Sequence, residues 1–197
     1  MTLRVEHLAK RFGQNSLFAD LCFEAAGPAV LWAPSGWGKT TLLRILLGLE
    51  KPDAGTVSGV GRAAAVFQED RLCPQLTAVE NVLLVLPEGR AARAGVEADF
   101  ARLGMAGEAL AVPAAKLSGG QKRRAALLRA VWARADSRFF DEPFTGLDPD
   151  AMARAAALLK ERCAGAPALL ATHDRAAIEA LGWPVMRLDE RPLRQLR

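Results

Sequence analysis

The segment from residue 29 to residue 52 constrains the fold more than any other part of the chain. Residues 29–33 (Ala-Val-Leu-Trp-Ala) form a continuous apolar run, as expected for a strand buried on both faces. A glycine-rich loop follows, and apolar residues then recur at helical spacing until Gly48 and Pro52 end the pattern. A strand, a glycine-rich loop and a helix in this order predict an α/β protein whose loop binds phosphate.

The loop has the residue types that phosphate binding requires. Gly36 and Gly38 allow close approach of backbone N–H groups, Lys39 supplies a point charge, and Thr40 supplies a hydroxyl for Mg²⁺. A chance glycine-rich turn is the alternative, and the flanking strand and helix disfavour it. The residues predicted to bind ATP in this segment are Pro34, Ser35, Gly36, Trp37, Gly38, Lys39, Thr40 and Thr41.

Further polar side chains follow two other predicted strands. Asp141 and Glu142 come after Phe139-Phe140, and His173 follows the apolar residues 168–172. An adjacent Asp-Glu pair alone is usually a solvated surface pair, and a lone histidine is usually structural. Ligands of open α/β sheets, however, bind beyond the carboxyl ends of the strands. We therefore expect these side chains to converge on the phosphate loop.

A second motif, Leu117-Ser118-Gly119-Gly120-Gln121, stands between the loop and the acidic pair. Together with Gln68, the run from Asp141 to Asp148 and His173, it resembles the ATP-binding cassette (ABC) ATPases from Arg4 to about Leu188. The resemblance implies a P-loop NTPase (RecA-like) core with an N-terminal antiparallel β element and a helical subdomain insertion. It implies one ABC ATP-binding domain over residues 1–197, with the core at about 1–69 and 120–197 and the helical subdomain at about 70–119.

The resemblance also assigns roles to the residues. It implies that Gln68, Glu142 and His173 are catalytic, with Glu142 polarising the attacking water and His173 contacting the γ-phosphate. Thr40, Gln68 and Asp141 would hold Mg²⁺. Phe12 would stack on adenine, and a core phenylalanine is nearly as good an interpretation. The signature residues Ser118, Gly119, Gly120 and Gln121 would contact the ATP of a second subunit, and Asp148 would belong to the dimer loop.

Three residues depart from the family pattern. Ala33 replaces a glycine, and its methyl group would reduce the fit if the position needs φ > 0. Trp37 is bulkier than the small residue expected there. Arg138 stands where another aliphatic residue would be usual, and we expect it at the exposed start of its strand.

Composition narrows the class of protein. A chain of 197 residues fits one domain, and no run approaches the ~18 apolar residues of a membrane span. The first residues include no apolar signal region, and three scattered cysteines indicate reduced, core-filling thiols in a cytoplasmic protein. The net charge of +4 is mild, and residues 122–124 (Lys-Arg-Arg) are predicted to form a solvated helix face. Nucleic acid is therefore not expected as a partner. His7 lacks functional context in the sequence.

The predicted function is ATP hydrolysis, with ATP and Mg²⁺ as cofactors, by a homodimer or paired cassette that forms on ATP binding. It would drive solute transport, in the importing direction, through a separate integral membrane permease with an extracytoplasmic solute-binding protein. The chain would be cytoplasmic and peripheral on the inner face of the cell membrane.

The permease groove is predicted at residues 69–76, with Leu72, Cys73 and Leu76 as its apolar surface. Residues 66–82 resemble nitrate, sulfonate and taurine importers. The alternatives are a non-transport ABC ATPase, for example in cofactor assembly, and a nucleotide sensor without turnover.

Overall fold

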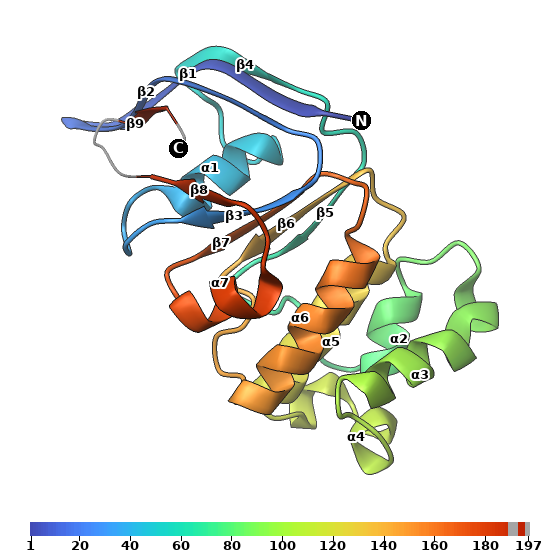
Figure 1. Ribbon diagram of the computed structural model, residues 1–197. Coiled ribbons are helices and arrows are strands. Elements are labelled where there is room, and N and C mark those ends of the chain that lie inside the picture. Colours follow the sequence, from blue (N-terminus) through green and yellow to red (C-terminus); the bar gives the residue numbers. More distant parts are fainter. Residues whose placement is uncertain (189–192, 196–197) are drawn as a thin grey trace.

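The computed structural model describes residues 1–188 and 193–195 and contains a parallel sheet at its centre (Figure 1). Its strands have the order β5-β6-β7-β3-β8, and every pair is parallel. The apolar runs at 29–33 and 168–172 correspond to the neighbouring strands β3 and β7 of this sheet. The strands are β3 (Pro28–Trp32), β5 (Ala63–Val66), β6 (Ser137–Asp141), β7 (Ala168–Thr172) and β8 (Val185–Arg187). The predicted α/β class is confirmed.

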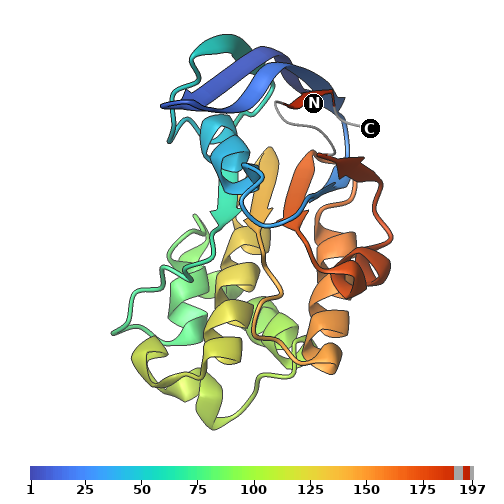
Figure 2. The same ribbon diagram turned by 90° about the vertical axis from the view of Figure 1, so that its left-hand side faces the viewer.

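A second sheet near the N-terminus is largely antiparallel, as expected. Its strands are β1 (Leu3–Phe12), β2 (Asn15–Ala25), β4 (Ala54–Ser58) and β9 (Leu193–Gln195), in the order β4-β1-β2-β9. Helix α1 (Lys39–Leu46) lies between this sheet and the parallel sheet (Figure 2). Its leucines and Ile45 pack into one apolar cluster with residues of both sheets, which fixes the end of the phosphate loop.

Helices α5 (Gly119–Trp132), α6 (Pro149–Arg162) and α7 (Arg175–Leu181) cover the opposite face of the parallel sheet (Figure 1). Helix α6 begins with two residues that favour a helix start. The Asp148 side chain accepts a hydrogen bond of 2.8 Å from the Ala151 N–H, and Pro149 occupies the first helical position.

The segment between β5 and α5 is helical. It contains α2 (Ala78–Leu83), η1 (Gly89–Ala92), α3 (Arg93–Arg102), α4 (Glu108–Ala111) and η2 (Ala114–Lys116). Thr77 and Glu80 form a capping box at the start of α2, in which each side chain accepts the backbone N–H of the other residue. Helices α2 and α3 pack on α5, and the helical segment lies away from the antiparallel sheet (Figure 2). Residues 189–192 and 196–197 of the predicted core range lie outside the described residues.

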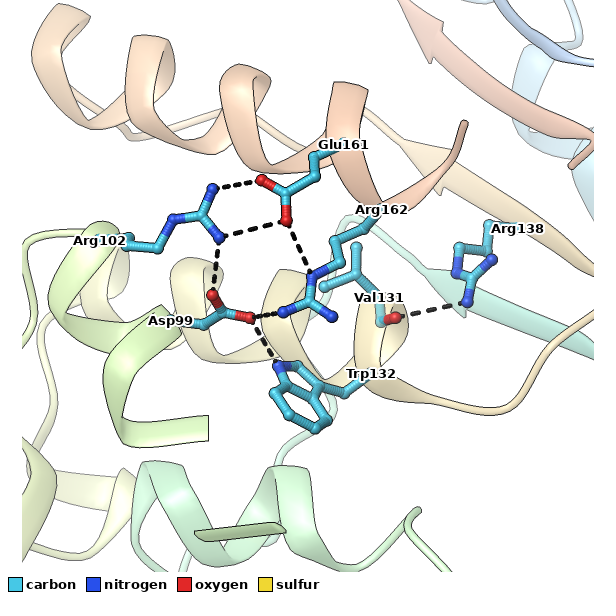
Figure 3. Close-up of polar contacts among 7 residues, drawn as sticks. All are labelled: Asp99, Arg102, Val131, Trp132, Arg138, Glu161 and Arg162. Atoms are coloured by element: carbon cyan, nitrogen blue, oxygen red, sulfur yellow. Dashed lines mark hydrogen bonds and ion pairs between the residues drawn. The ribbon is translucent and has the colours of Figure 1, made fainter. Parts of the chain in front are cut away.

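A buried carboxylate ties this helical segment to the helices under the sheet (Figure 3). Asp99 of α3 accepts hydrogen bonds from the Trp132 indole (3.0 Å), from Arg102 (2.9 Å) and from Arg162 of α6 (2.5 Å). Arg102 also pairs with Glu161 of α6 at 2.6 Å. The Asp99 side chain is 4% exposed, so its charge depends on these partners.

Two sequence-based expectations about single residues were wrong. Arg138 is not at an exposed strand start: its guanidinium donates to the carbonyls of Ala130, Val131 and Ala133, where α5 ends (Figure 3). Those carbonyls have no partner within the helix, and a cation satisfies them. The cysteines are not all core-filling, because Cys22 and Cys73 are exposed and only Cys163 is buried.

Candidate nucleotide-binding site

The glycine-rich loop joins β3 to α1 at the carboxyl end of its strand. Gly36 and Gly38 have φ values of 75° and 87°, which favour glycine. Gly38 is also close-packed, since a Cβ atom there would lie 3.2 Å from the Phe18 ring. Ala33 is fully buried and does not have a positive φ, so its methyl group fits where the family has glycine.

The predicted nucleotide-binding residues line one hollow above this loop. Its walls come from β1, β2, the phosphate loop, α1 and the end of β6. The lining residues are Phe12, Leu17, Ser35, Gly36, Trp37, Gly38, Lys39, Thr40, Thr41, Gln68, Asp141 and Glu142. Pro34 does not line it, although its carbonyl contacts Lys39.

Lys39 bends back over the loop that precedes it. Its ammonium group donates to the carbonyls of Ala33 (2.7 Å) and Pro34 (3.2 Å) and lies 3.6 Å from Glu142 Oε1. The residue is 6% exposed. The loop therefore holds a nearly buried positive charge at the position where phosphate is expected.

Asp141 is the last residue of β6 and is 2% exposed. The Thr40 hydroxyl donates to Oδ2 at 2.7 Å, whereas Oδ1 is buried without a hydrogen-bond partner. Burial raises the pKa of Asp141, and the neighbouring Glu142 raises it further. An orphaned carboxylate oxygen beside a threonine hydroxyl is a donor set that fits Mg²⁺.

Glu142 is held in a strained conformation with φ 47°. The Thr172 hydroxyl donates to its Oε2 at 2.9 Å, and His173 Nδ1 lies 2.8 Å from its Oε1. The acidic pair and the histidine thus meet, as their positions after neighbouring strands predict. His173 itself is 62% exposed in a hollow next to the first, which Glu142 also lines.

Gln68 follows β5 and is held by a residue that the sequence interpretation missed. Arg123 of α5 donates to the carbonyls of Phe67 (2.6 Å) and Gln68, and it pairs with Asp70 at 3.3 Å. Arg123 is 6% exposed, and Arg124 bonds to the Leu103 carbonyl, so residues 122–124 are not simply a solvated face. Arg123 lies four residues before Leu127 on an apolar helix face, and this spacing could have indicated from the sequence that Arg123 is buried.

Phe12 is 51% exposed and borders the hollow, which excludes the core interpretation. The Lys10 ammonium lies 4.8 Å from its ring centroid. The Phe12 ring therefore lies at the rim of the hollow, beside the phosphate loop, with one face presented to solvent.

The signature residues, 118–121, lie outside the nucleotide hollow. The Ser118 hydroxyl caps α5 by accepting from the Gln121 N–H, and Gln121 accepts from the Ser118 N–H. Gly120 packs against the turn before Asp148, since a Cβ atom there would lie 3.3 Å from the Gly146 carbonyl oxygen. None of residues 118–121 lines the hollow.

The predicted permease groove is only partly where we expected it. Leu72 packs partly buried against the core instead of lining a groove. A hollow on the helical segment includes Leu76, but its other walls are Glu80, Leu83, Leu84, Gly89, Arg90 and Arg93. Leu84 and Val85 are 59% and 39% exposed.

A phosphate loop at a strand-to-helix junction, with a buried Asp-Glu pair beside it, defines a P-loop nucleotide-binding protein. The model of the family described as "ABC transporter" matches residues 19–145. This chain therefore belongs to the ABC transporter family, as an ATP-binding ATPase.

Individual relatives agree with this assignment. Aliphatic sulfonates import ATP-binding protein SsuB 1 of Nocardia farcinica is 41% identical over 88% of this chain and 72% of its own length. SsuB 1 of Pseudomonas syringae pv. syringae is 36% identical over 98% of this chain and 81% of its own. The fold matches a dimeric, post-hydrolysis structure of the ATP-binding cassette MJ0796 bound to ADP and Pi. That match has a TM-score of 0.79 and 22% identity and covers 99% of this chain and 96% of the other.

Within the described residues, no helix has the length and apolar character needed to cross a bilayer.

Proposed function

We propose that this chain binds ATP with Mg²⁺ and hydrolyses it to power solute import through a separate permease. The observation that carries this proposal is the convergence of Lys39, Asp141 and Glu142 at one edge of the parallel sheet. The core, at residues 1–69 and 120–197, would hold the nucleotide. The helical subdomain, at residues 70–119, would contact the permease.

Thr40, Asp141 and Gln68 would hold the metal ion. Bound Mg²⁺ neutralises charge on the β- and γ-phosphates. The Thr40 hydroxyl would turn from Asp141 Oδ2 toward the cation, and the unpaired Oδ1 would gain a partner. Lys39 would exchange its bonds to the loop carbonyls for phosphate oxygens, and Phe12 would stack on the adenine.

Glu142 would act as the general base. Thr172 and His173 each hold one of its oxygens, so its carboxylate has a fixed orientation. Lys39 would leave Glu142 Oε1 when it turns to the phosphates, and a water would take its place on that oxygen beside His173. Glu142 would accept the proton of that water, and His173 would contact the γ-phosphate.

Replacing the base tests the hydrolysis. Glu142→Gln should lower ATP turnover by roughly 10²–10⁴-fold, the usual contribution of a positioned general base. ATP binding should persist, because the loop and Lys39 are unchanged. Phosphate release and equilibrium binding of a fluorescent ATP analogue measure the two. Glu69→Gln, at a side chain that is 81% exposed, is the matched control and should turn over normally. Turnover near the wild-type rate in Glu142→Gln would remove Glu142 from the chemistry.

The hollow at Leu76, Leu83 and Leu84 is the proposed permease contact. A short amphipathic helix placed there would cover exposed leucine surface, and Glu80, Arg90 and Arg93 offer charged groups at the rim. Relatives named for aliphatic sulfonate import make a sulfonate the solute that we propose.

Leu84→Asp should therefore abolish co-purification with the permease encoded beside the gene and growth on an alkanesulfonate as sole sulfur source. Leu49→Asp, at an equally exposed leucine (55%) after α1, should preserve both. Basal ATPase activity of the free subunit should survive in each variant. Equal permease capture by both variants would show that the permease binds elsewhere on the chain. If the wild type captured the permease but did not support growth on the sulfonate, a sulfonate would not be the solute.

A further inference from the structure

A second cluster of ligand-type side chains lies on the antiparallel sheet. It comprises His7 of β1 with Asp20 and Cys22 of β2, and one ligand atom from each lies within 4.8 Å of the others. His7 Nδ1 is 2.6 Å from Asp20 Oδ1 and 4.0 Å from Cys22 Sγ. The Cys22 thiol is exposed and free of any disulfide. None of the three lines the nucleotide hollow.

The backbone brings these side chains together through a pair of bulges. In β1, two residues, the second of them His7, stand opposite Cys22 alone. In β2, two residues, the second of them Asp20, stand opposite Ala9 alone. The two irregularities cancel at the pair of Lys10 and Phe18, and a third shift follows between Lys10 and Arg11. A bulge re-aims a side chain, and here one on each strand directs a ligand toward the same point.

The arrangement is strained and tightly accommodated. His7 and Asp20 have φ values of 53° and 62°, and among the described residues the only other non-glycine residues with positive φ are Arg71 and Glu142. Gly55 of β4 faces the first bulge, where a Cβ atom would lie 2.4 Å from the His7 carbonyl oxygen. The His7 N–H donates to Cys22 Sγ at 3.1 Å, so the backbone of the first bulge also contacts the thiol.

We propose that His7, Asp20 and Cys22 form a surface site for Zn²⁺, distinct from the magnesium site of the nucleotide. A thiolate, an imidazole and a carboxylate are its preferred protein ligands, and three of them leave a fourth position open to water. Thiolate and carboxylate together balance the charge of the cation. With metal–ligand bonds of about 2.0–2.3 Å, the imidazole and carboxylate must separate slightly and the thiolate must approach. Exposed side chains can make both movements.

Cobalt reports on the thiolate ligand directly. Nucleotide-free full-length protein, stripped with a chelator, should bind one equivalent of Co²⁺ with a thiolate-to-cobalt charge-transfer band and tetrahedral visible bands. Zn²⁺ should displace the cobalt and bleach both. Cys163 cannot supply this band, because burial raises the pKa of its thiol to about 11.

Matched variants separate this site from other cysteines. Cys22→Ser and His7→Gln should weaken Zn²⁺ binding by at least about 100-fold, since losing a mere outer-shell partner costs roughly 10–100-fold. Cys73→Ser, at the other exposed cysteine, should bind as the wild type does. In the wild type, Zn²⁺ should also slow alkylation of Cys22 but not of Cys73, a readout that needs no variant.

Absence of the charge-transfer band in the wild type, or its persistence in Cys22→Ser, would overturn the proposal. Equal alkylation of Cys22 with and without Zn²⁺ would do the same.

Discussion

Single residues carry most of the chemistry. The buried side chain of Asp141 shows that placing such a residue at the site lowers the stability of the protein. Its carboxylate is buried with one oxygen unpaired, and burial raises its pKa above the ordinary value. A folded-state pKa above the unfolded one means that the folded protein binds the proton more tightly. The free energy of unfolding therefore falls as pH rises through the window between the two values, and at neutral pH the charge destabilises the nucleotide-free protein.

Asp141→Asn should accordingly raise the melting temperature of the nucleotide-free protein at pH 7, since it removes the buried charge and keeps an acceptor for Thr40. The gain should vanish at a pH below both pKa values, where the wild-type carboxyl is protonated too. Added Mg²⁺ and ATP should stabilise the variant less than the wild type. Differential scanning fluorimetry measures all three. A lower melting temperature at pH 7 would show that Asp141 supports the apo fold.

Site residues that belong to a recognisable motif were predicted from the sequence. A residue whose side chain binds distant backbone carbonyls was not. Lys39, Asp141, Glu142 and His173 were found because strand ends and loop spacing place them together. Arg123 was missed because a run of basic residues at 122–124 resembles a solvated face. Its role depends on carbonyls more than fifty residues away, at Phe67 and Gln68. Its position on an apolar helix face could have indicated that Arg123 is buried, but the sequence does not indicate which carbonyls it contacts.

Helices and strands were predictable where their ends are capped. Thr77 and Asp148 mark the starts of α2 and α6 through side-chain bonds. Ser118 likewise caps helix α5, which begins at Gly119. Helix α3 has no side-chain cap and no acidic residue in its first turn. Its position depends on tertiary contacts, which are those of the buried Val96 and Phe100 together with Asp99.

The Asp99 network should therefore hold α3 to α5 and α6. Asp99→Asn keeps the shape but removes the charge that Arg102 and Arg162 share. It should lower the free energy of unfolding by about 1.5–3 kcal/mol, the range for a hydrogen bond to a charged group. Urea unfolding followed by tryptophan fluorescence measures the loss. Glu97→Gln breaks an exposed pair with Arg93 and should cost no more than about 0.5 kcal/mol. Equal losses would mean that burial adds nothing to the network.

The whole molecule contains a nucleotide hollow and, apart from it, a signature segment at the start of α5. Residues 118–121 line no part of that hollow, so we propose that they act on the ATP of a second chain, with Asp148 beside them. The start of α5 presents backbone N–H groups and the positive end of the helix dipole, which favour an anion. Apolar runs predicted strands of the parallel sheet and the helix after the phosphate loop, whereas the antiparallel sheet was expected only from the family resemblance. Pairing between two chains is invisible in one sequence without the family resemblance.

The most direct test of this account is the mass of the protein in solution with ATP. Size exclusion with light scattering should show Glu142→Gln as a monomer alone and as a dimer with ATP, because the uncleaved nucleotide holds two chains together. Ser118→Arg added to Glu142→Gln should restore the monomer, since its bulk and lost cap disrupt the contact with the opposing phosphate. A double variant that still dimerises with ATP, or a Glu142→Gln protein that binds ATP and stays monomeric, would contradict the account.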